Sequence, residues 1–261
     1  MDVSAPQSDE GESDVTSTPH AVPGAGRGRR TGGWNWPAGT FLGDLPAESR
    51  ERLFAVGAQR QYPADKILIR EHELSEDNMF VLVLLDGLVK VTGLAQDARE
   101  ALVAVRVGGE LVGEFGALDH QRRSATVTTC GAVTARVISQ RELADTMRRD
   151  SRLADAVNRS ILGKMREANT RLIDFAGCDV PTRLARILLE LATLYGVEQD
   201  DGVAIQRMTQ PELASLVGAA EPTIHKAMRR LREDAIASPR YGKQIIHDLE
   251  RLRRVAYPEP D

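Results

Sequence analysis

Gly113-Glu114-Phe115-Gly116-Ala117-Leu118, closed by Arg123-Ser124-Ala125-Thr126, is the stretch of this sequence that says most about its fold and chemistry. The backbone N–H groups of a glycine-rich turn can cradle phosphate oxygens together with a serine hydroxyl. A planar guanidinium can clamp the phosphate, and a carboxylate can accept a hydrogen bond from a sugar hydroxyl. The stretch therefore predicts a pocket for an anionic, ribose-bearing ligand, with candidate residues Gly113, Glu114, Arg123 and Ser124.

Short β-branched or alternating runs surround this stretch between residues 34 and 140. Turn residues separate them, and Asp86-Gly87 between two apolar runs is a strong hairpin signal. Closely spaced short strands are typical of a sandwich or a jelly-roll barrel. We expect a short helix at 47–58, followed by strands at 67–69, 79–85, 88–92, 101–105, 125–129 and 132–138.

The periodicity changes after Ser139. Apolar side chains now recur at steps of 4, 3, 4 and 3 residues, at Ile161, Met165, Ala168, Leu172 and Phe175. This heptad seam predicts one helix over 141–176 that pairs with a second copy of the chain. The alternative is that the stripe packs on the chain's own barrel.

Residues 209–231 have the spacing of a helix-turn-helix. Ala214 is small where two helices would cross, Gly218 allows the positive φ of the turn, and Ile224 is the apolar plug. The segment 236–246 has the pattern of a β-hairpin wing. From 207 to 254 there are ten Lys and Arg against six Asp and Glu, although the whole chain has a formal net charge of −4. We predict a DNA-binding domain over 177–261, the alternative being an inert helical hairpin.

Composition argues against several other classes of protein. The chain has 261 residues, enough for two domains, and 42% of them are hydrophobic. Two distant cysteines and five scattered histidines favour neither a disulfide framework nor a metal site, so we expect no metal and no iron–sulfur cluster. No apolar run reaches the ~18 residues of a membrane-spanning helix, and no signal-peptide pattern opens the chain. We therefore expect a cytoplasmic protein that does not contact a membrane.

The first 33 residues are rich in Ser, Asp, Glu, Pro, Gly and Thr and have almost no large apolar side chains. Such a segment cannot bury enough surface to offset its ordering entropy, so we expect a disordered tail. Its basic end, 24–30, is an alternative candidate for contacts with DNA phosphates.

A phosphate-type cassette in a β-roll, a long helix and a winged helix-turn-helix together resemble the cyclic-AMP receptor protein and FNR superfamily of bacterial transcription regulators. The resemblance covers about residues 40–256. It implies an α+β fold: an N-terminal double-stranded jelly roll that binds a cyclic nucleotide, a dimerisation helix at 141–176 and a C-terminal winged helix-turn-helix. It also implies a homodimer on double-stranded DNA, RNA polymerase as a partner, and a cyclic nucleotide as effector, with cAMP favoured.

Carried over by position, the resemblance implies that residues 113 and 114 face the ribose and that residues 123 and 124 bind the cyclic phosphate. The family holds the base with a Thr and its neighbour on the long helix, where this chain has Ala168 and Asn169. Asn169 keeps a donor and an acceptor that can read a purine edge from one or both subunits. The alternative for Glu114 and Arg123 is a structural ion pair in a barrel without a ligand.

The recognition helix departs from the founding member's Arg-Glu-Thr, because this chain has Glu221-Pro222-Thr223 there. Glu221 can accept from a cytosine amino group but cannot donate to guanine as arginine does, so Lys226 is the remaining candidate for a guanine. We therefore predict DNA binding without the family's familiar operator sequence. The candidate DNA-binding residues are Thr209, Gln210, Glu221, Pro222, Thr223, His225, Lys226 and Lys243.

These patterns leave three functional hypotheses. The first is a homodimeric transcription regulator controlled by a cyclic nucleotide. The second is a regulator of the same superfamily that binds DNA with no nucleotide or with another effector. The third, from a different class, is a cyclic-nucleotide module of an enzyme. No paired-carboxylate motif, GxSxG or P-loop supports the third hypothesis, so we expect no enzymatic activity.

Overall fold

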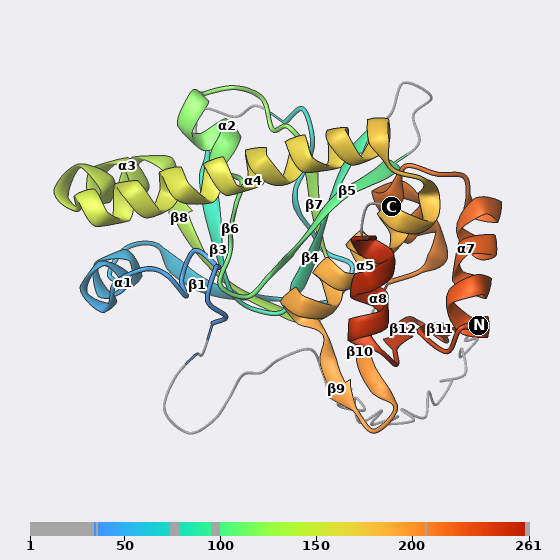
Figure 1. Ribbon diagram of the computed structural model, residues 1–261. Coiled ribbons are helices and arrows are strands. Elements are labelled where there is room, and N and C mark those ends of the chain that lie inside the picture. Colours follow the sequence, from blue (N-terminus) through green and yellow to red (C-terminus); the bar gives the residue numbers. More distant parts are fainter. Residues whose placement is uncertain (1–33, 35, 74–78, 95–99, 207, 259–261) are drawn as a thin grey trace, which may run out of the picture.

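The computed structural model describes residues 34, 36–73, 79–94, 100–206 and 208–258. An N-terminal β-roll and a smaller C-terminal domain of helices and short strands are joined by a long helix (Figure 1). The α+β fold expected from the sequence is confirmed. The segment expected to be a disordered tail, 1–33, lies outside the described residues.

The β-roll consists of two antiparallel four-stranded sheets, with strand orders β1-β8-β3-β6 and β2-β7-β4-β5 in the described residues. Alternate side chains of β3 point to its two faces. Leu82 and Leu84 pack between the sheets with Val89 and Val127, whereas Val81 and Val83 pack on the covering helices. The elements are α1 (Ala47–Phe54), β1 (Ala58–Tyr62), β2 (Ile67–Ile69), β3 (Phe80–Asp86), β4 (Leu88–Leu94), β5 (Glu100–Val107), β6 (Leu111–Val112), α2 (Glu114–Asp119), β7 (Thr126–Thr129) and β8 (Val133–Ser139).

The hairpin predicted at Asp86-Gly87 is wrong. Gly87 has the positive φ of a tight turn, 93°, but the strands on its two sides, β3 and β4, belong to different sheets. The turn is therefore a corner of the roll. A Cβ at Gly87 would lie 2.6 Å from the carbonyl oxygen of Ala132, so the corner needs glycine.

The single helix predicted over 141–176 is two helices, α3 (Gln140–Arg149) and α4 (Ser151–Gly177). The chain is extended between them at Asp150, with φ −137° and ψ 96°. The Asp150 carboxylate is buried. It accepts a hydrogen bond from the Leu153 amide at 3.2 Å and forms an ion pair with Arg52 at 3.1 Å. Asp150 thus caps α4 and fixes its start against α1.

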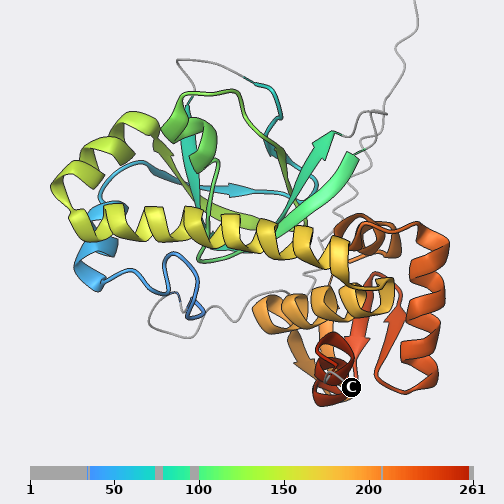
Figure 2. The same ribbon diagram turned by 45° about the horizontal axis from the view of Figure 1, so that its top comes forward.

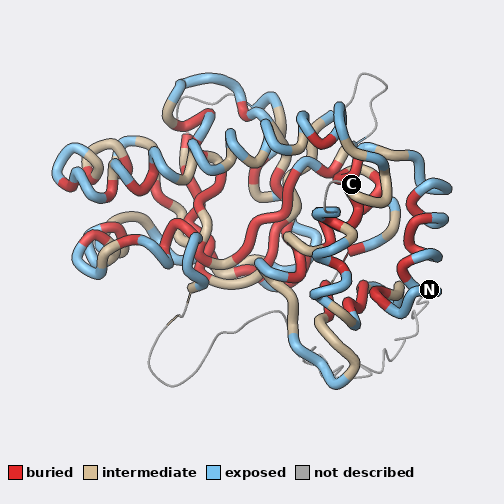
Figure 3. The backbone as a smooth tube through the Cα atoms, viewed as in Figure 1, coloured by how far each residue is buried: buried red, intermediate tan, exposed pale blue. Residues whose placement is uncertain are grey.

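The apolar stripe of α4 has different surroundings in its two halves. Near the start of the helix, Leu153 and Val157 are fully buried against the β-roll. Further along, Met165 and Leu172 are 54% and 64% exposed in the single chain. Figure 2 shows the helix running along the roll, and Figure 3 shows that buried positions become fewer toward the C-terminal domain. The stripe therefore packs on the chain's own barrel in the first half, and its second half lies open.

Replacing Asp150 by alanine should lower the free energy of unfolding by about 1–2 kcal/mol at neutral pH, the usual value of an N-cap. Burial opposes the ionised form, but the Ser49 hydroxyl, the Leu153 amide and Arg52 together hold the pKa of Asp150 below its ordinary value of 3.8. A carboxyl whose pKa is lower in the folded state stabilises above its unfolded pKa, and this contribution disappears as pH falls through the folded pKa.

Urea unfolding at pH 7 and at a series of acid pH values measures this effect. The gap between the wild type and Asp150→Ala should close below about pH 4. Asp145→Ala, which removes an exposed partner of Arg148 on α3, is the control and should change stability by less than about 0.5 kcal/mol. An equal gap at pH 7 and pH 2 would contradict the assignment.

In the C-terminal domain, α5 packs on α8, on both helices of the helix-turn-helix and on β10. The four strands of this domain form a sheet of order β11-β12-β10-β9 in the described residues. The predicted wing is present as the hairpin β11–β12. A second hairpin, β9–β10, precedes the helix-turn-helix. The elements are α5 (Val180–Tyr195), β9 (Val197–Gln199), β10 (Gly202–Gln206), α6 (Gln210–Val217), α7 (Glu221–Glu233), β11 (Ala237–Arg240), β12 (Lys243–Ile246) and α8 (Leu249–Ala256).

The two domains share one apolar cluster. Leu102 and Val105 of β5 belong to the same buried cluster as Leu213 and Leu216 of α6, and α6 packs on β5. An ion pair between Lys90 of β4 and Glu212 of α6 lies on the same contact.

A second contact ties the end of α4 to the turn of the helix-turn-helix. The Phe175 ring lies against Gly218, and the Arg183 guanidinium stacks on that ring at 5.3 Å from its centroid. Arg183 also donates to the carbonyl oxygens of Val217 at 3.1 Å and Cys178 at 2.9 Å. The end of α4 is therefore held against the backbone of the helix-turn-helix at Val217 and Gly218.

Candidate ligand pocket and DNA-binding helix

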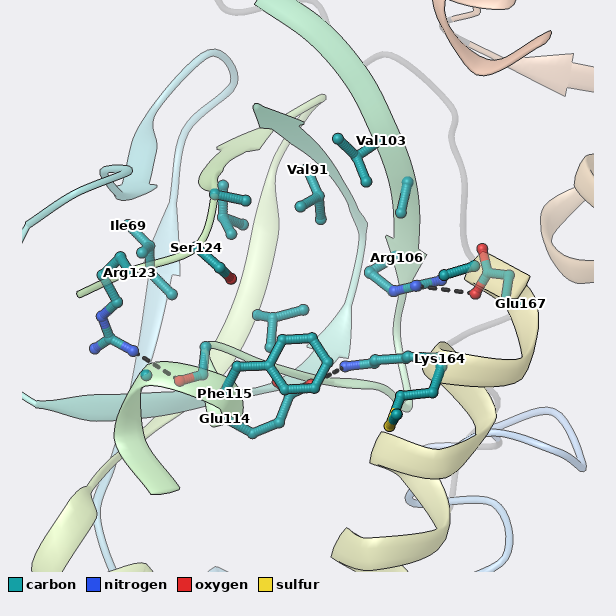
Figure 4. Close-up of a pocket in the computed structure, with 18 of the residues that line it drawn as sticks. Ile69, Val91, Val103, Arg106, Glu114, Phe115, Arg123, Ser124, Lys164 and Glu167 are labelled. Atoms are coloured by element: carbon teal, nitrogen blue, oxygen red, sulfur yellow. Dashed lines mark hydrogen bonds and ion pairs between the residues drawn. The ribbon is translucent and has the colours of Figure 1, made fainter. Parts of the chain in front are cut away.

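A cavity of about 420 Å³ lies between the β-roll, α2 and α4. Its apolar wall comes from strands of the β2-β7-β4-β5 sheet, including Ile69, Val91 and Val103 (Figure 4). Four basic and two acidic side chains also line it, so the charge balance of the wall favours an anion. These are Arg106, Arg123, Lys164, Arg171, Glu114 and Glu167.

The cassette begins at Gly113, which precedes α2 and has φ 83°. A Cβ there would lie 2.7 Å from the Ile69 side chain and 3.1 Å from the Arg123 guanidinium. Glycine is therefore needed both for the backbone conformation and for the approach of Arg123. The segment after it, predicted as a turn, is the short helix α2, which directs Glu114 and Phe115 toward the cavity.

Arg123 is only 5% exposed. Its guanidinium donates to the carbonyl oxygens of Gly113 at 2.7 Å and Phe80 at 2.8 Å, and it stacks on the Phe80 ring at 5.0 Å. Burial lowers its pKa, but an arginine stays protonated at neutral pH. A guanidinium has five N–H donors, so three remain beyond those two bonds. Arg123 can thus support the roll and still bind an anion beside the exposed Ser124.

Glu114 does not form the ion pair with Arg123 that the sequence offered as an alternative. Its buried carboxylate binds the Lys164 ammonium of α4 at 2.6 Å. The same ammonium donates to the carbonyl oxygen of Leu111 at 2.5 Å. The acid that was expected to face a ribose is therefore held by a lysine from the long helix.

A second ionic cluster lies on the other side of Lys164 (Figure 4). Glu167 of α4 binds Arg106 of β5 at 3.0 Å and Arg171 at 2.6 Å, and Arg171 also reaches Glu190 of α5 at 3.2 Å. Burial is the main cause that raises the pKa of Glu190, although Arg171 opposes it. The cluster connects the β-roll, the long helix and the C-terminal domain.

The helix-turn-helix presents the outer face of α7 to solvent (Figure 1). Ile224 and Met228 are buried on its inner face, which packs on α6. The candidate residues on the outer face are all exposed: Glu221, Pro222, Thr223, His225 and Lys226. At the start of α6, the exposed Thr209 donates from its amide at 2.8 Å and its hydroxyl at 2.9 Å to Glu212.

Comparison with known proteins matches both parts of the chain. A family described as "Cyclic nucleotide-binding domain" matches residues 59–150, and one described as "Crp-like helix-turn-helix domain" matches residues 182–255. The chain belongs to the Crp/Fnr superfamily. A superfamily relative in Mycobacterium tuberculosis, the "CRP-like cAMP-activated global transcriptional regulator", is 29% identical over 84% of this chain and 96% of its own length.

One further relative and one solved structure are also similar to this chain. The cAMP-activated global transcriptional regulator Vfr of Pseudomonas aeruginosa is 24% identical over 75% of this chain and 92% of its own. The solved structure of the c-di-GMP responsive global regulator CLP of Xanthomonas campestris matches with a TM-score of 0.67 at 21% identity. It covers 78% of this chain and 100% of that one. The latter likeness supports the fold.

The structure brings four of the five ligand candidates of this Crp/Fnr chain together. Gly113, Glu114, Arg123 and Ser124 line the cavity; Asn169 is exposed and lies outside the wall that one chain forms, where Ala168 stands. That Asn169 contacts a ligand stays a prediction, because the contact would require a second copy of the chain. Of the DNA candidates, Lys243 binds Gln199 at 2.8 Å on the wing.

Sequence reasoning missed Lys164, Arg106 and Arg171. Lys164 precedes Ala168 by one helical turn and therefore lies on the helix face that was expected to contact the nucleotide base. This spacing could have identified Lys164 from the sequence. The strand position of Arg106 gave no such signal. Among the described residues, no three His, Cys, Asp or Glu side chains gather as metal ligands would. None of the helices in that part of the chain is long and apolar enough to span a bilayer.

Proposed function

We propose that the chain is a homodimeric, DNA-binding transcription regulator of the cytoplasm, controlled by a cyclic nucleotide in the β-roll cavity. One observation carries the proposal: the cavity lies between the cassette and α4, and the end of α4 packs through Phe175 on the turn of the helix-turn-helix at Gly218. A ligand that touches both walls changes the position of α4, and thereby the spacing of two recognition helices.

The chemistry of the cavity supports a cyclic nucleotide. Arg123 has donors left for a cyclic phosphate, Ser124 has an exposed hydroxyl beside it, and Glu114 is the acceptor for the ribose. The apolar wall at Val91 and Val103 suits a purine base. Cyclic AMP is the favoured ligand, because two of the relatives are named as cAMP-activated.

The open half of α4 supports the homodimer. Met165, Leu172, Ile173 and Phe175 are exposed large apolar side chains on this half of one helix. A second copy packed on this stripe removes their surface from water. The same arrangement brings Asn169 of each subunit near the cavity of the other, where its amide can read a purine edge.

The exposed face of α7 supports DNA binding by the dimer. Two recognition helices about 34 Å apart fit successive major grooves. Lys226 is a donor for guanine, and Thr209 and Gln210 are candidates for backbone phosphate. RNA polymerase is the partner through which a regulator bound at a promoter acts.

Calorimetric titration of the purified protein with cAMP and cGMP tests the effector. Selection of bound fragments from a random DNA pool, with and without nucleotide, tests DNA recognition by the helix-turn-helix. We expect heat of binding with cAMP and tighter DNA binding in its presence. DNA binding that ignores both nucleotides would favour a regulator with another effector or none, an alternative that the occupation of Glu114 by Lys164 supports.

The enzyme-module hypothesis predicts a different result. A module of that kind would not retain genomic DNA fragments even at low salt. The helix-turn-helix occupies the place where an enzyme domain would follow the sensor, which supports the regulator.

Replacing Lys226 by alanine should weaken binding to the selected DNA site by about tenfold, because it removes one donor to a base or phosphate. Arg148→Ala is the matched control. It removes the same charge from an exposed position on α3, far along the chain from the recognition helix, and should leave DNA affinity unchanged. Retardation assays at several salt concentrations measure both variants. Equal affinities for the Lys226→Ala protein and the wild type would remove this residue from the interface.

A further inference from the structure

We propose that Lys90 of the β-roll takes part in DNA binding through Glu212: its ammonium neutralises a carboxylate that would otherwise repel the phosphates at the start of α6. The inference rests on the proposed function, because it uses the phosphate contacts proposed for Thr209 and Gln210. It gives the sensor domain a share in DNA affinity. Lys90 is thus a positioning residue, which acts on DNA only through Glu212.

Glu212 lies where the DNA backbone is expected. Its Oε2 atom accepts hydrogen bonds from the Thr209 amide at 2.8 Å and from the Thr209 hydroxyl at 2.9 Å, which closes the capping box of α6. A phosphate beside Thr209 and Gln210 is therefore within about one helical turn of this carboxylate. Two negative charges at that separation repel each other, so Glu212 weakens DNA binding unless a cation balances its charge.

Lys90 supplies that cation from the other domain. Its ammonium binds Oε1 of Glu212, the carboxylate oxygen that Thr209 does not use. The side chains of Lys90 and Glu212 are only 22% and 23% exposed, so solvent and salt screen the pair less than an ion pair on the surface. The pair leaves the capping box intact and brings the charge at this end of α6 close to neutral.

The packing of the two domains holds Lys90 in this place. Lys90 lies on β4, where it is paired with Val105 of β5. Val105 and Leu102 belong to the same apolar cluster as Leu213 of α6. The ammonium can therefore stay on Glu212 only while α6 remains packed on β5, so the neutralisation depends on the arrangement of the domains.

DNA and the packing of the domains consequently favour each other. If α6 leaves β5, the carboxylate of Glu212 faces the phosphates without its cation, and DNA binds less tightly. Because linkage is reciprocal, bound DNA favours the chain in which α6 is packed on β5 by the same factor. The β-roll then holds the orientation of the DNA-binding domain while DNA is bound.

The opposite assignment is that the packing of α6 on β5 restrains the DNA-binding domain. The exposure of the DNA candidates argues against it, because Thr209 at the start of α6 and Lys226 on the outer face of α7 stay exposed in the packed arrangement. The two assignments predict effects of opposite sign. Removing Lys90 weakens DNA binding in the first and strengthens it in the second.

Retardation assays on the full chain test the inference with two probes, the fragment selected from the random DNA pool and a duplex of random sequence at low salt. Lys90→Met should bind both probes about fivefold more weakly than the wild type, because the repulsion acts on backbone phosphates and not on bases. The loss should shrink as salt is added, since ions screen the phosphates from Glu212. Each assay is run with and without cAMP, so that the effector does not limit the comparison.

Rescue variants separate the charge of Glu212 from the stability of the fold. Glu212→Gln removes the charge and keeps an oxygen that can accept from Thr209. The double variant Lys90→Met with Glu212→Gln should therefore bind DNA within about twofold of the wild type, as should Lys90→Arg, which keeps the charge. Urea unfolding shows how much of any loss is a loss of folded protein. If Lys90→Met does not fold, Lys90→Gln keeps a hydrogen-bond donor without the charge and should show the same loss and rescue.

Arg60→Met is the matched control, because it removes a positive charge from an exposed position on β1, in the sheet that does not contain β4 and β5. Its DNA affinity should equal that of the wild type. A loss in Lys90→Met that the double variant restores supports the inference. An unchanged or tighter affinity, a loss that the double variant does not restore, or an equal loss in Arg60→Met overturns the inference and leaves the proposed function standing. A wild type that binds neither probe overturns both.

Discussion

Replacing Arg123 by alanine is expected to abolish binding of a cyclic nucleotide and to lower the free energy of unfolding by about 3 kcal/mol. The guanidinium donates to the carbonyl oxygens of Gly113 and Phe80, and both acceptors lose this partner in the variant. The cation over the Phe80 ring is lost as well. The same change removes the donors proposed for the cyclic phosphate.

Two variants separate the structural from the ligand-binding role of Arg123. Arg123→Lys keeps the charge but has no planar fork to span both carbonyls, so it should recover only part of the stability and bind nucleotide at least tenfold more weakly. Ser124→Ala alters an exposed side chain and should weaken nucleotide binding with no loss of stability. Thermal unfolding and calorimetry measure the two quantities separately. Wild-type affinity in Arg123→Ala would remove this residue from the ligand site.

Replacing Gly218 by alanine is expected to destabilise the C-terminal domain and to reduce DNA binding strongly. Gly218 has φ 64°, where a side chain costs about 1–2 kcal/mol. A Cβ there would also lie 2.5 Å from Cε1 of Phe175, and relieving that overlap costs about 1–3 kcal/mol more. The overlap pushes the helix-turn-helix away from the end of α4, so the geometry of the DNA-binding domain changes along with its stability.

Gly242→Ala is the matched control for this prediction. Gly242 has φ 67°, but no atom lies within 4 Å of the Cβ it would acquire. It therefore carries the backbone cost alone, and the difference between the two variants measures the clash with Phe175. Adding Phe175→Leu to Gly218→Ala should recover part of that difference, as read by urea unfolding. Equal losses in the two single variants would show that the contact at Phe175 carries no strain.

Local sequence patterns predicted much of the fold. The strands of the β-roll were recognisable because β-branched runs alternate with turn residues, and the helix-turn-helix because a small residue, a glycine and an apolar plug recur at a fixed spacing. The hairpin β9–β10 turns at Asp200-Asp201, between the paired residues Gln199 and Gly202, and two acidic residues are a weaker hairpin signal than Asn-Gly or Asp-Gly. The hairpin prediction at Asp86-Gly87 was wrong because consecutive strands of a jelly roll can belong to different sheets, as β3 and β4 do. The residues of the turn do not indicate which sheet the next strand joins.

The candidate site was only half predictable. The cassette at 113–124 lies on one continuous segment, so its residues could be found together. Lys164, Arg106 and Arg171 reach the cavity from other elements, and only the packing of α4 on the β-roll brings them to Glu114 and Glu167. The break at Asp150 was hidden for a related reason, because the Arg52 that binds its carboxylate lies on α1.

The apolar cluster that continues from β5 into α6 couples the stability of each domain to the other. Leu102 and Val105 have their partners in the other domain, so neither domain buries its full core alone. The helix-turn-helix is consequently a poor module to cut out or to graft onto another sensor, since a chimera must rebuild the face that β5 covers. Substitutions inside the β-roll can then change how much folded DNA-binding domain a cell contains, without touching either ligand.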